Sequence, residues 1–75
     1  MSIDLKLAAA KAKALPDRQR QVLACLARGL LVKETAAELC IAPRTVKNTR
    51  AMVYSKLGVN NAVEAMRVAY QAKLV

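Results

Sequence analysis

The segment from Ala42 to Leu57 constrains the fold of this 75-residue chain more than any other part of it. Pro43 suits the first position of a helix, where its missing N–H leaves no intrahelical hydrogen bond unmade. Val46, Val53 and Leu57 then recur at helical spacing along one side. The segment therefore predicts a helix with one apolar face and one polar, basic face.

A short amphipathic segment lies immediately before this helix. Residues 33–39, with the sequence KETAAEL, predict another helix, and Cys40-Ile41-Ala42 is only long enough to be the turn between two helices at a steep angle. Thr45 and Lys47, at the start of the later helix, lie within reach of phosphate groups. Together the two segments predict a helix-turn-helix whose second helix lies in a DNA groove.

Short motifs follow one another in a fixed order along residues 15–75. They are Leu15, Arg18, Val22-Leu23, Ala27-Arg28-Gly29-Leu30, Lys33-Glu34, Ala36, Leu39, Thr45-Val46-Lys47-Asn48, Lys56-Leu57-Gly58-Val59 and Glu64-Ala65. The ordered set resembles the LuxR-type (GerE-type) DNA-binding domain of bacterial transcription regulators. This resemblance implies an all-α, four-helix fold in which the third helix reads the major groove and the fourth forms a dimer.

Capping signals place the four expected helices. The first begins near Pro16-Asp17, with Asp17 as the cap, and runs to Arg28. The second spans about Val32 to Cys40, the third Pro43 to Leu57, and the fourth Ala62 to Ala72 after a capping-box pair, Asn61 and Glu64. The core face of the first helix is expected to hold Val22, Leu23, Leu26 and Cys25.

Residues 1–14 precede this domain and are rich in Ala and Lys, which favours a helix without a clear apolar stripe. They could form a frayed arm, an extra helix packed on the domain, or a phosphate grip through Lys6, Lys11 and Lys13. We favour a solvated helical arm.

The charge of the chain indicates a polyanionic partner. Thirteen Lys and Arg against five Asp and Glu give a formal net charge of +8. Tyr54 and Tyr70 are the only aromatic residues, so stacking platforms for single strands or RNA loops are missing, and double-stranded DNA is the expected partner. A chain this small buries only about 60 to 65% of its unfolded surface, and a second subunit would supplement its thin core.

Catalysis and metal binding are not expected. The chain has no His, and Gly29 and Gly58 fit helix ends better than a phosphate-cradling loop. Cys25 and Cys40 cannot supply the four ligands of a zinc site alone, so we expect reduced core thiols and no cofactor. No apolar run approaches 18 residues and the start lacks a signal-peptide pattern, which predicts a cytoplasmic protein without membrane contact.

The third helix carries the expected DNA contacts. Positions 46, 49, 50, 53 and 57 share its inner face, which turns Arg44, Lys47, Asn48, Ala51, Met52 and Ser55 outward. Lys47 can donate to guanine, Asn48 can pair with adenine, and Ala51 can touch a thymine methyl group. The expected phosphate contacts are Lys33, Arg44, Thr45 and Lys56.

Several positions depart from the family pattern. Leu31-Val32 stands where a polar cap is common, which costs about 1 kcal/mol of helix stability and suggests a contact surface or an altered loop. Thr49-Arg50 replaces His and an apolar residue, while Met52 and Ala62 replace basic ones. These changes affect the expected affinity and sequence preference and leave the fold in place.

The fourth helix is expected to form the dimer seam through Val63, Met66, Arg67 and Tyr70, spaced three and four apart. An alternative to a dimeric regulator is a protein-interaction module that pairs with a larger LuxR-type regulator and modulates it, with Leu30-Leu31-Val32 as part of the contact. The family domain usually follows a receiver or ligand-binding domain. The chain is therefore either a regulator without a sensor, controlled by concentration, dimerisation or a partner, or a piece of a larger regulator.

Overall fold

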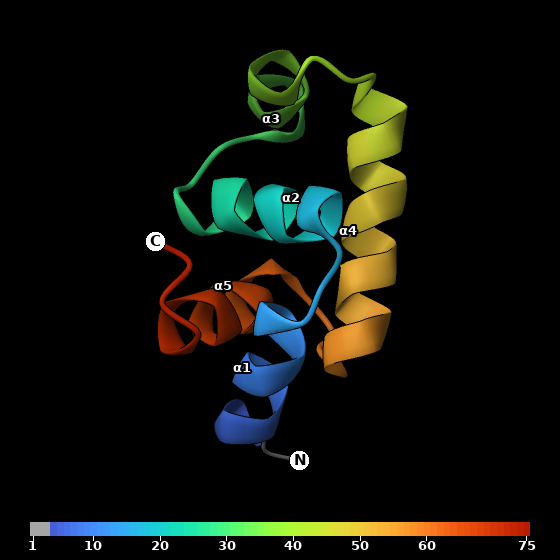
Figure 1. The fold of residues 1–75 in the computed structure, drawn as a ribbon. Coiled ribbons are helices and arrows are strands. Elements are labelled where there is room, and N and C mark those ends of the chain that lie inside the picture. Colours follow the sequence, from blue (N-terminus) through green and yellow to red (C-terminus); the bar gives the residue numbers. More distant parts are fainter. Residues whose placement is uncertain (1–3) are drawn as a thin grey trace.

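The computed structural model describes residues 4–75, which form five helices joined by short turns (Figure 1). The helices are α1 (Leu5–Lys13), α2 (Asp17–Ala27), α3 (Val32–Leu39), α4 (Pro43–Leu57) and α5 (Ala62–Gln71). No strand occurs between residues 4 and 75. The expected all-α fold is confirmed, with α2 to α5 as its four helices and α1 as an extra one. None of these helices has the length and apolar character needed to span a membrane.

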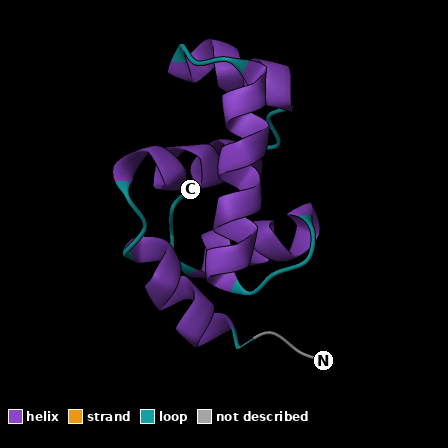
Figure 2. Ribbon diagram, turned by 90° about the vertical axis from the view of Figure 1, so that its right-hand side faces the viewer, coloured by secondary structure: helices purple, strands orange, loops and turns teal. Residues whose placement is uncertain are grey.

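Two groups of buried side chains hold the helices together. The larger group joins α1, α2, α4 and α5, and Leu23, Val53 and Val68 are among its least exposed members. The smaller group consists of Val22, Ala36 and Val46 and joins α2, α3 and α4. The helix α4 contributes to both groups because it runs along most of the molecule, with α3 beside one end and α5 beside the other (Figure 1 and Figure 2).

The helix α1 is packed into the fold, so the expectation of a solvated arm is wrong for this segment. Ala8, Ala9 and Ala12 are buried in the larger core group, and α1 contacts both α4 and α5. The facing part of the same group is also rich in small side chains, and small residues let helix axes approach closely. Alanine adds little to an apolar stripe, which is why the sequence pattern did not predict this packing. Residues 1–3 of the expected arm lie outside the described part of the chain.

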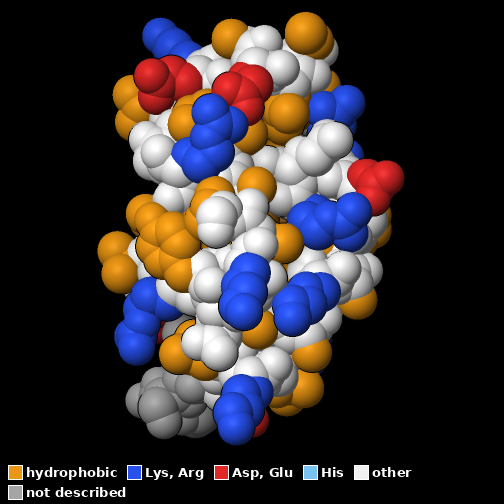
Figure 3. All heavy atoms as spheres, turned by 60° about the vertical axis from the view of Figure 1, so that its left-hand side comes forward, with side chains coloured by type: hydrophobic (Ala, Val, Ile, Leu, Met, Phe, Trp, Pro, Cys, Tyr) orange, Lys and Arg blue, Asp and Glu red, His pale blue; other side chains and the backbone are white. Residues whose placement is uncertain are grey.

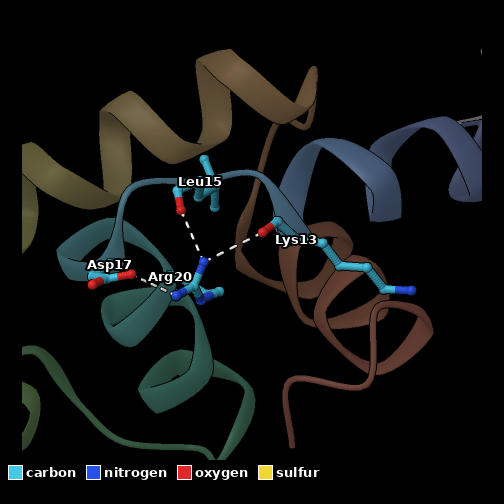
Figure 4. Close-up of polar contacts among 4 residues, drawn as sticks. All are labelled: Lys13, Leu15, Asp17 and Arg20. Carbon is cyan, nitrogen blue, oxygen red and sulfur yellow. Dashed lines mark hydrogen bonds and ion pairs between the residues drawn. The ribbon is translucent and has the colours of Figure 1, made fainter.

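A guanidinium group fixes the junction between α1 and α2. Arg20 donates from Nη1 to the carbonyl oxygens of Lys13 at 3.3 Å and Leu15 at 3.1 Å, and from Nη2 to Asp17 Oδ1 at 2.6 Å (Figure 4). These bonds satisfy the carbonyl group of the last residue of α1 and one in the connection to α2. The orientation of α1 is therefore set by directional contacts as well as by alanine packing.

The helix bounds agree with expectation to within one residue, but one cap differs. Pro16 is the N-cap of α2 and offers no side-chain acceptor, while the Asp17 carboxylate bonds to Arg20 instead of to free N–H groups. The cap of α5 is confirmed, since Asn61 Oδ1 accepts from the Glu64 N–H at 3.0 Å. The Glu64 side chain reaches one residue further back than in a capping box and accepts from the Asn60 N–H at 2.7 Å.

Both glycines end helices as predicted, with φ values of 85° at Gly29 and 71° at Gly58. After each glycine the chain turns back, since Leu30 N–H donates to the carbonyl of Cys25 at 3.1 Å and Val59 N–H to that of Tyr54 at 3.0 Å. Both helices thus end in a Schellman motif, the left-handed turn that glycine adopts without steric cost.

The two cysteines occupy different environments. Cys25 is buried on α2, as expected, and burial together with the neighbouring Glu38 carboxylate raises the pKa of its thiol. Cys40 is exposed at the end of α3, so the expectation of a core thiol is wrong at this position. Although its neighbours in sequence are apolar, Cys40 lies just after the end of α3, and its side chain no longer follows the buried face of that helix.

Candidate nucleic-acid interface

The turn between α3 and α4 sets the angle of the helix-turn-helix. Cys40 adopts the left-handed conformation with φ of 57°, and the following Ile41 N–H donates to the carbonyl of Ala36 at 3.0 Å. Ala42 is the N-cap of α4, and Pro43 occupies the first turn as predicted. Ile41 and Val46 pack with the smaller core group, which holds α3 against the first half of α4. The backbone of the turn and this apolar contact together position α4.

One side of α4 is buried and the other is open to solvent, as the spacing predicted. Val46, Thr49, Val53 and Leu57 are buried, and Arg50 is half-buried beside them. The exposed side carries Arg44, Lys47, Asn48, Ala51, Met52 and Ser55. Arg44 and Lys47 give this face a positive charge, and Asn48 adds an amide that can both donate and accept hydrogen bonds. The face can therefore meet phosphate oxygens and the polar edges of bases.

The residues expected to contact phosphate are exposed, but one of them also bonds within the domain. Lys33 on α3 and Thr45 at the start of α4 are exposed. Lys56 is also exposed, but its Nζ donates to the Oε1 atom of the buried Gln19 at 2.9 Å. An ammonium group has three donors, so Lys56 retains others after this bond is made. The Lys56 ammonium group is nevertheless held by its bond to α2 and is not free to move in solvent.

The start of α3 replaces its missing polar cap with a side chain from inside the helix. Leu31 is the N-cap residue and has no side-chain acceptor, but Glu34 Oε1 accepts from the Leu31 N–H at 2.7 Å. This is half of a capping box, and the negative charge lies near the positive end of the helix dipole. The Leu31 side chain remains 69% exposed. The chain therefore presents a large apolar side chain next to Lys33.

An ion pair joins the C-terminal end of α2 to α3, the first helix of the helix-turn-helix. The Arg28 guanidinium donates to both carboxylate oxygens of Glu38, with 3.4 Å for the longer contact. Hydrogen bonding from Arg28 is the main reason that the pKa of the Glu38 carboxyl is lowered. Cys25 Sγ lies 3.6 Å from the same carboxylate and supplies a weaker donor. This cluster ties the start of the α2–α3 turn to the C-terminal end of α3.

Positive charge is not confined to the exposed side of α4. Figure 3 views the molecule from the side of the C-terminus, with α4 turned away, and Lys and Arg side chains are spread over this face as well. Acidic side chains are most prominent there toward the end that carries α3. The net charge therefore indicates a polyanionic partner without locating the contact, and the location depends on the arrangement of α3 and α4.

The exposed side of α5 lies opposite its buried side. Ala65, Val68 and Ala69 are buried, whereas Val63 and Tyr70 are 67% and 53% exposed. Arg67 is exposed, and Met66 is half-buried and packs against the larger core group. Tyr70 Oη donates to the carbonyl of Ala27 at 2.7 Å. Of the four residues expected in a dimer seam, Met66 and Tyr70 thus also make contacts within the domain.

Sequence reasoning missed the polar contacts that join α4 and α5 to α2 and to the turn after it. Arg50 was placed on the inner face, but its Nη2 donates to the carbonyl of Leu30 at 3.0 Å. The Lys56–Gln19 and Tyr70–Ala27 bonds were not predicted either. Each joins residues from different helices or turns, and no local pattern encodes such a pair. The only available signal was Arg50 itself, a charged side chain in an apolar register.

Comparison with known proteins supports the geometric interpretation. Residues 13–69 match the family model described as bacterial regulatory proteins, luxR family. The transcriptional regulatory protein UhpA of Escherichia coli (strain K12) is 49% identical over 65 residues, which cover 87% of this chain and 33% of UhpA. The transcriptional regulatory protein FixJ of Azorhizobium caulinodans is 45% identical over 58 residues, 77% of this chain and 28% of FixJ. The probable transcriptional regulatory protein NarL of Mycobacterium tuberculosis is 40% identical over 68 residues, 91% of this chain and 32% of NarL. The chain spans about a third of the length of these relatives.

Proposed function

Because the chain belongs to the luxR family of bacterial regulatory proteins, we propose that it is a transcription regulator that binds double-stranded DNA with α4 in the major groove. The observation that carries this proposal is the exposed side of α4, where Arg44, Lys47 and Asn48 are all open to solvent. The opposite side is anchored in both core groups. A helix held in this way presents its polar side chains to a groove without giving up its own packing.

The side chains on this face divide by the chemistry they offer. Lys47 donates to guanine O6 or N7, and Asn48 pairs with the N6 and N7 atoms of adenine. Ala51 lies on the same exposed face and touches a thymine methyl group. Arg44, Thr45 and the free N–H groups of the first turn of α4 bind phosphate, with Lys33 and Lys56 as flanking contacts. Base contacts give sequence preference, and phosphate contacts give register and affinity.

Selection of duplexes from a randomised pool, followed by binding titrations of single variants, tests the DNA contacts. Lys47→Ala and Asn48→Ala should each lower the preference for the selected duplex by about 1 to 3 kcal/mol, since each removes a contact to a base edge. The matched controls are Lys73→Ala, which removes an exposed cation beyond α5, and Gln21→Ala, which removes an exposed amide of α2. Preference that is unchanged in both α4 variants would defeat this assignment.

We further propose that two subunits pair through the exposed side of α5. One recognition helix contacts about one half-site, and a two-fold dimer brings two of them to major-groove faces about one helical turn apart. Val63, Met66, Arg67 and Tyr70 form the seam, with Val63 and Tyr70 supplying its exposed apolar surface. Arg67 lies at the rim, where charged side chains are tolerated.

Val63→Asp is the cleanest test of the seam. At 67% exposure, this side chain can become charged without burying a charge in the monomer, whereas Met66→Asp would also disturb the core. The variant should sediment as a monomer and lose far more affinity for a two-half-site duplex than for a single half-site, while Gln21→Asp behaves as wild type. A wild-type protein that is monomeric both free and on DNA would refute the seam.

A protein-interaction module that pairs with a larger regulator of the same family remains the second candidate, favoured by the exposure of Leu31. The salt dependence of DNA binding separates the two functions. Each neutralised phosphate contributes about −0.9 to the slope of log affinity against log salt concentration, so a DNA-binding domain with several contacts shows a steep response. A nearly flat response would favour the interaction module.

A further inference from the structure

The last residue of α2 and the turn that follows it, residues 27–31, receive polar contacts from α3, α4 and α5. Tyr70 of α5 donates to the carbonyl of Ala27 at 2.7 Å, and Arg50 of α4 donates to the carbonyl of Leu30 at 3.0 Å. Glu38 of α3 accepts from the Arg28 side chain. The turn itself is closed by its own Schellman bonds. Because α3, α4 and α5 each bond to this segment, it can orient all three helices relative to α2.

Arg50 reaches this turn from the side of α4 that faces away from solvent. Asn48 and Arg50 are two positions apart, which places their side chains about 200° apart around the helix axis. Arg50 is half-buried, and its Nε atom is shielded from solvent and has no hydrogen-bond partner among residues 4–75. An arginine that bound phosphate from the exposed face would hold its guanidinium in the open. The geometry fits an internal strut.

The apolar contacts of α4 set which side of the helix is buried, but they constrain its exact rotation less sharply than a directional bond does. Val46, Val53 and Leu57 are aliphatic, and hydrophobic burial has no preferred direction. A hydrogen bond depends on angle as well as distance, so the Arg50 bond resists rotation that aliphatic contacts would tolerate. The Lys56–Gln19 bond acts near the C-terminal end of α4 in the same way.

We propose that Arg50 is a positioning residue for sequence recognition: by bonding to the carbonyl of Leu30, it sets the rotation of α4 about its axis and so the direction of Lys47 and Asn48. This inference rests on the proposed DNA-binding function. Because α4 is one continuous helix, a rotation that follows loss of the bond turns Lys47 and Asn48 together with Arg50. Arg50 itself makes no contact with DNA.

Two readouts on Arg50→Met separate a strut from a phosphate contact. Methionine keeps an unbranched side chain but removes the charge and the donors. The ratio of affinity for the selected duplex to that for an unrelated duplex should fall about tenfold or more, the discrimination carried by one displaced base contact. The slope of log affinity against log salt concentration should equal that of wild type, because no phosphate contact is lost. Lys73→Met, which removes one exposed cation beyond α5, is the matched control for charge.

Each alternative outcome decides against the inference. A slope shallower by about 0.9 would show that Arg50 neutralises a phosphate, and an unchanged affinity ratio would show that it positions nothing. If Arg50→Met does not fold, Arg50→Lys replaces it, since lysine keeps the charge but lacks the planar guanidinium group. An internal strut predicts a reduced affinity ratio for this variant, and a phosphate contact predicts an unchanged one. A wild-type protein that selects no sequence from the pool overturns the proposed function, and the role of Arg50 with it. A wild-type preference that Arg50→Met retains overturns the inference alone.

Discussion

Replacement of Cys40 by glycine should stabilise the protein, because Cys40 occupies the left-handed region at the turn of the helix-turn-helix. Its φ of 57° and ψ of 44° cost an L-residue about 1 to 2 kcal/mol relative to glycine. The side chain is exposed and gives little in return, since Sγ lies 3.9 Å from the carbonyl of Ala37, near the limit for a sulfur hydrogen bond. The substitution therefore removes backbone strain without opening a cavity.

The net gain is smaller than the strain because glycine makes the unfolded chain more flexible. This entropic penalty is about 0.5 to 1 kcal/mol, so, from the middle of both ranges, the free energy of unfolding should rise by about 0.75 kcal/mol. For a domain of this size, that change raises Tm by about 2 to 8 °C. Urea unfolding followed by circular dichroism measures the free energy, and an unchanged m-value would show that the denatured state is comparable.

Ala37→Gly is the matched control for this prediction. Ala37 is exposed within the same helix and has an ordinary helical backbone, so glycine there should cost about 1 kcal/mol. The same kind of change, three residues apart, should thus have opposite signs. If Cys40→Gly lowers stability as Ala37→Gly does, the left-handed conformation is not a source of strain and the reasoning fails.

Three further predictions concern other parts of the fold. In the native protein a water-soluble thiol reagent should modify Cys40 quickly and Cys25 only on unfolding, because Cys25 is buried and burial raises the pKa of its thiol. Hydrogen bonding from Arg28 is the main reason that the pKa of Glu38 is lowered in the folded state. The carboxylate therefore contributes its full stabilisation above the pKa of the unfolded state and loses it as the pH falls through the pKa of the folded state. The unfolding curves of wild type and Glu38→Gln should converge in acid. Ala12→Glu should destabilise the protein by more than about 2 kcal/mol, since Ala12 is fully buried and the new carboxylate has no room there.

The control for α1 is Ala10→Glu, an exposed position two residues earlier on the same helix. It should change stability by no more than about 0.5 kcal/mol. Equal effects at the two positions would mean that α1 is not packed as described. For the thiols, rapid modification of both cysteines without unfolding would contradict the burial of Cys25. A constant difference between wild type and Glu38→Gln down to acid pH would contradict the link to Glu38 ionisation.

The bounds and faces of α4 could be predicted because both are written locally in the sequence. Pro43 marks the start, Gly58 marks the end, and apolar residues between them repeat with the helical period. The same local signals placed the start of α5 at Asn61. The packing of α1 could not be predicted in this way, since alanine is a good helix former on any face and its burial depends on a neighbour that is far away in sequence.

The candidate site was predictable in its exposed part and not in its support. Lys47 and Asn48 follow from the register of α4, but the bond from Arg50 to Leu30 spans 20 residues and that from Tyr70 to Ala27 spans 43. Such pairs depend on how the helices cross, and helix crossing is decided by the whole core. A sequence that places a charged side chain in an apolar register indicates that a buried partner is needed but does not identify it.

Only substitutions of side chains without bonds inside the domain report on function alone. Lys56 and Tyr70 were both expected at contact surfaces, yet each also donates a hydrogen bond to α2, to Gln19 and to Ala27 respectively. Loss of either side chain changes the interior and the surface together, so reduced DNA binding or altered association would have two explanations. Lys47 and Val63 are exposed and have no such bond within residues 4–75. An effect of changing them on DNA binding or association, with stability unchanged, therefore indicates a contact with a partner, and these residues can decide the proposed DNA contact and the proposed seam.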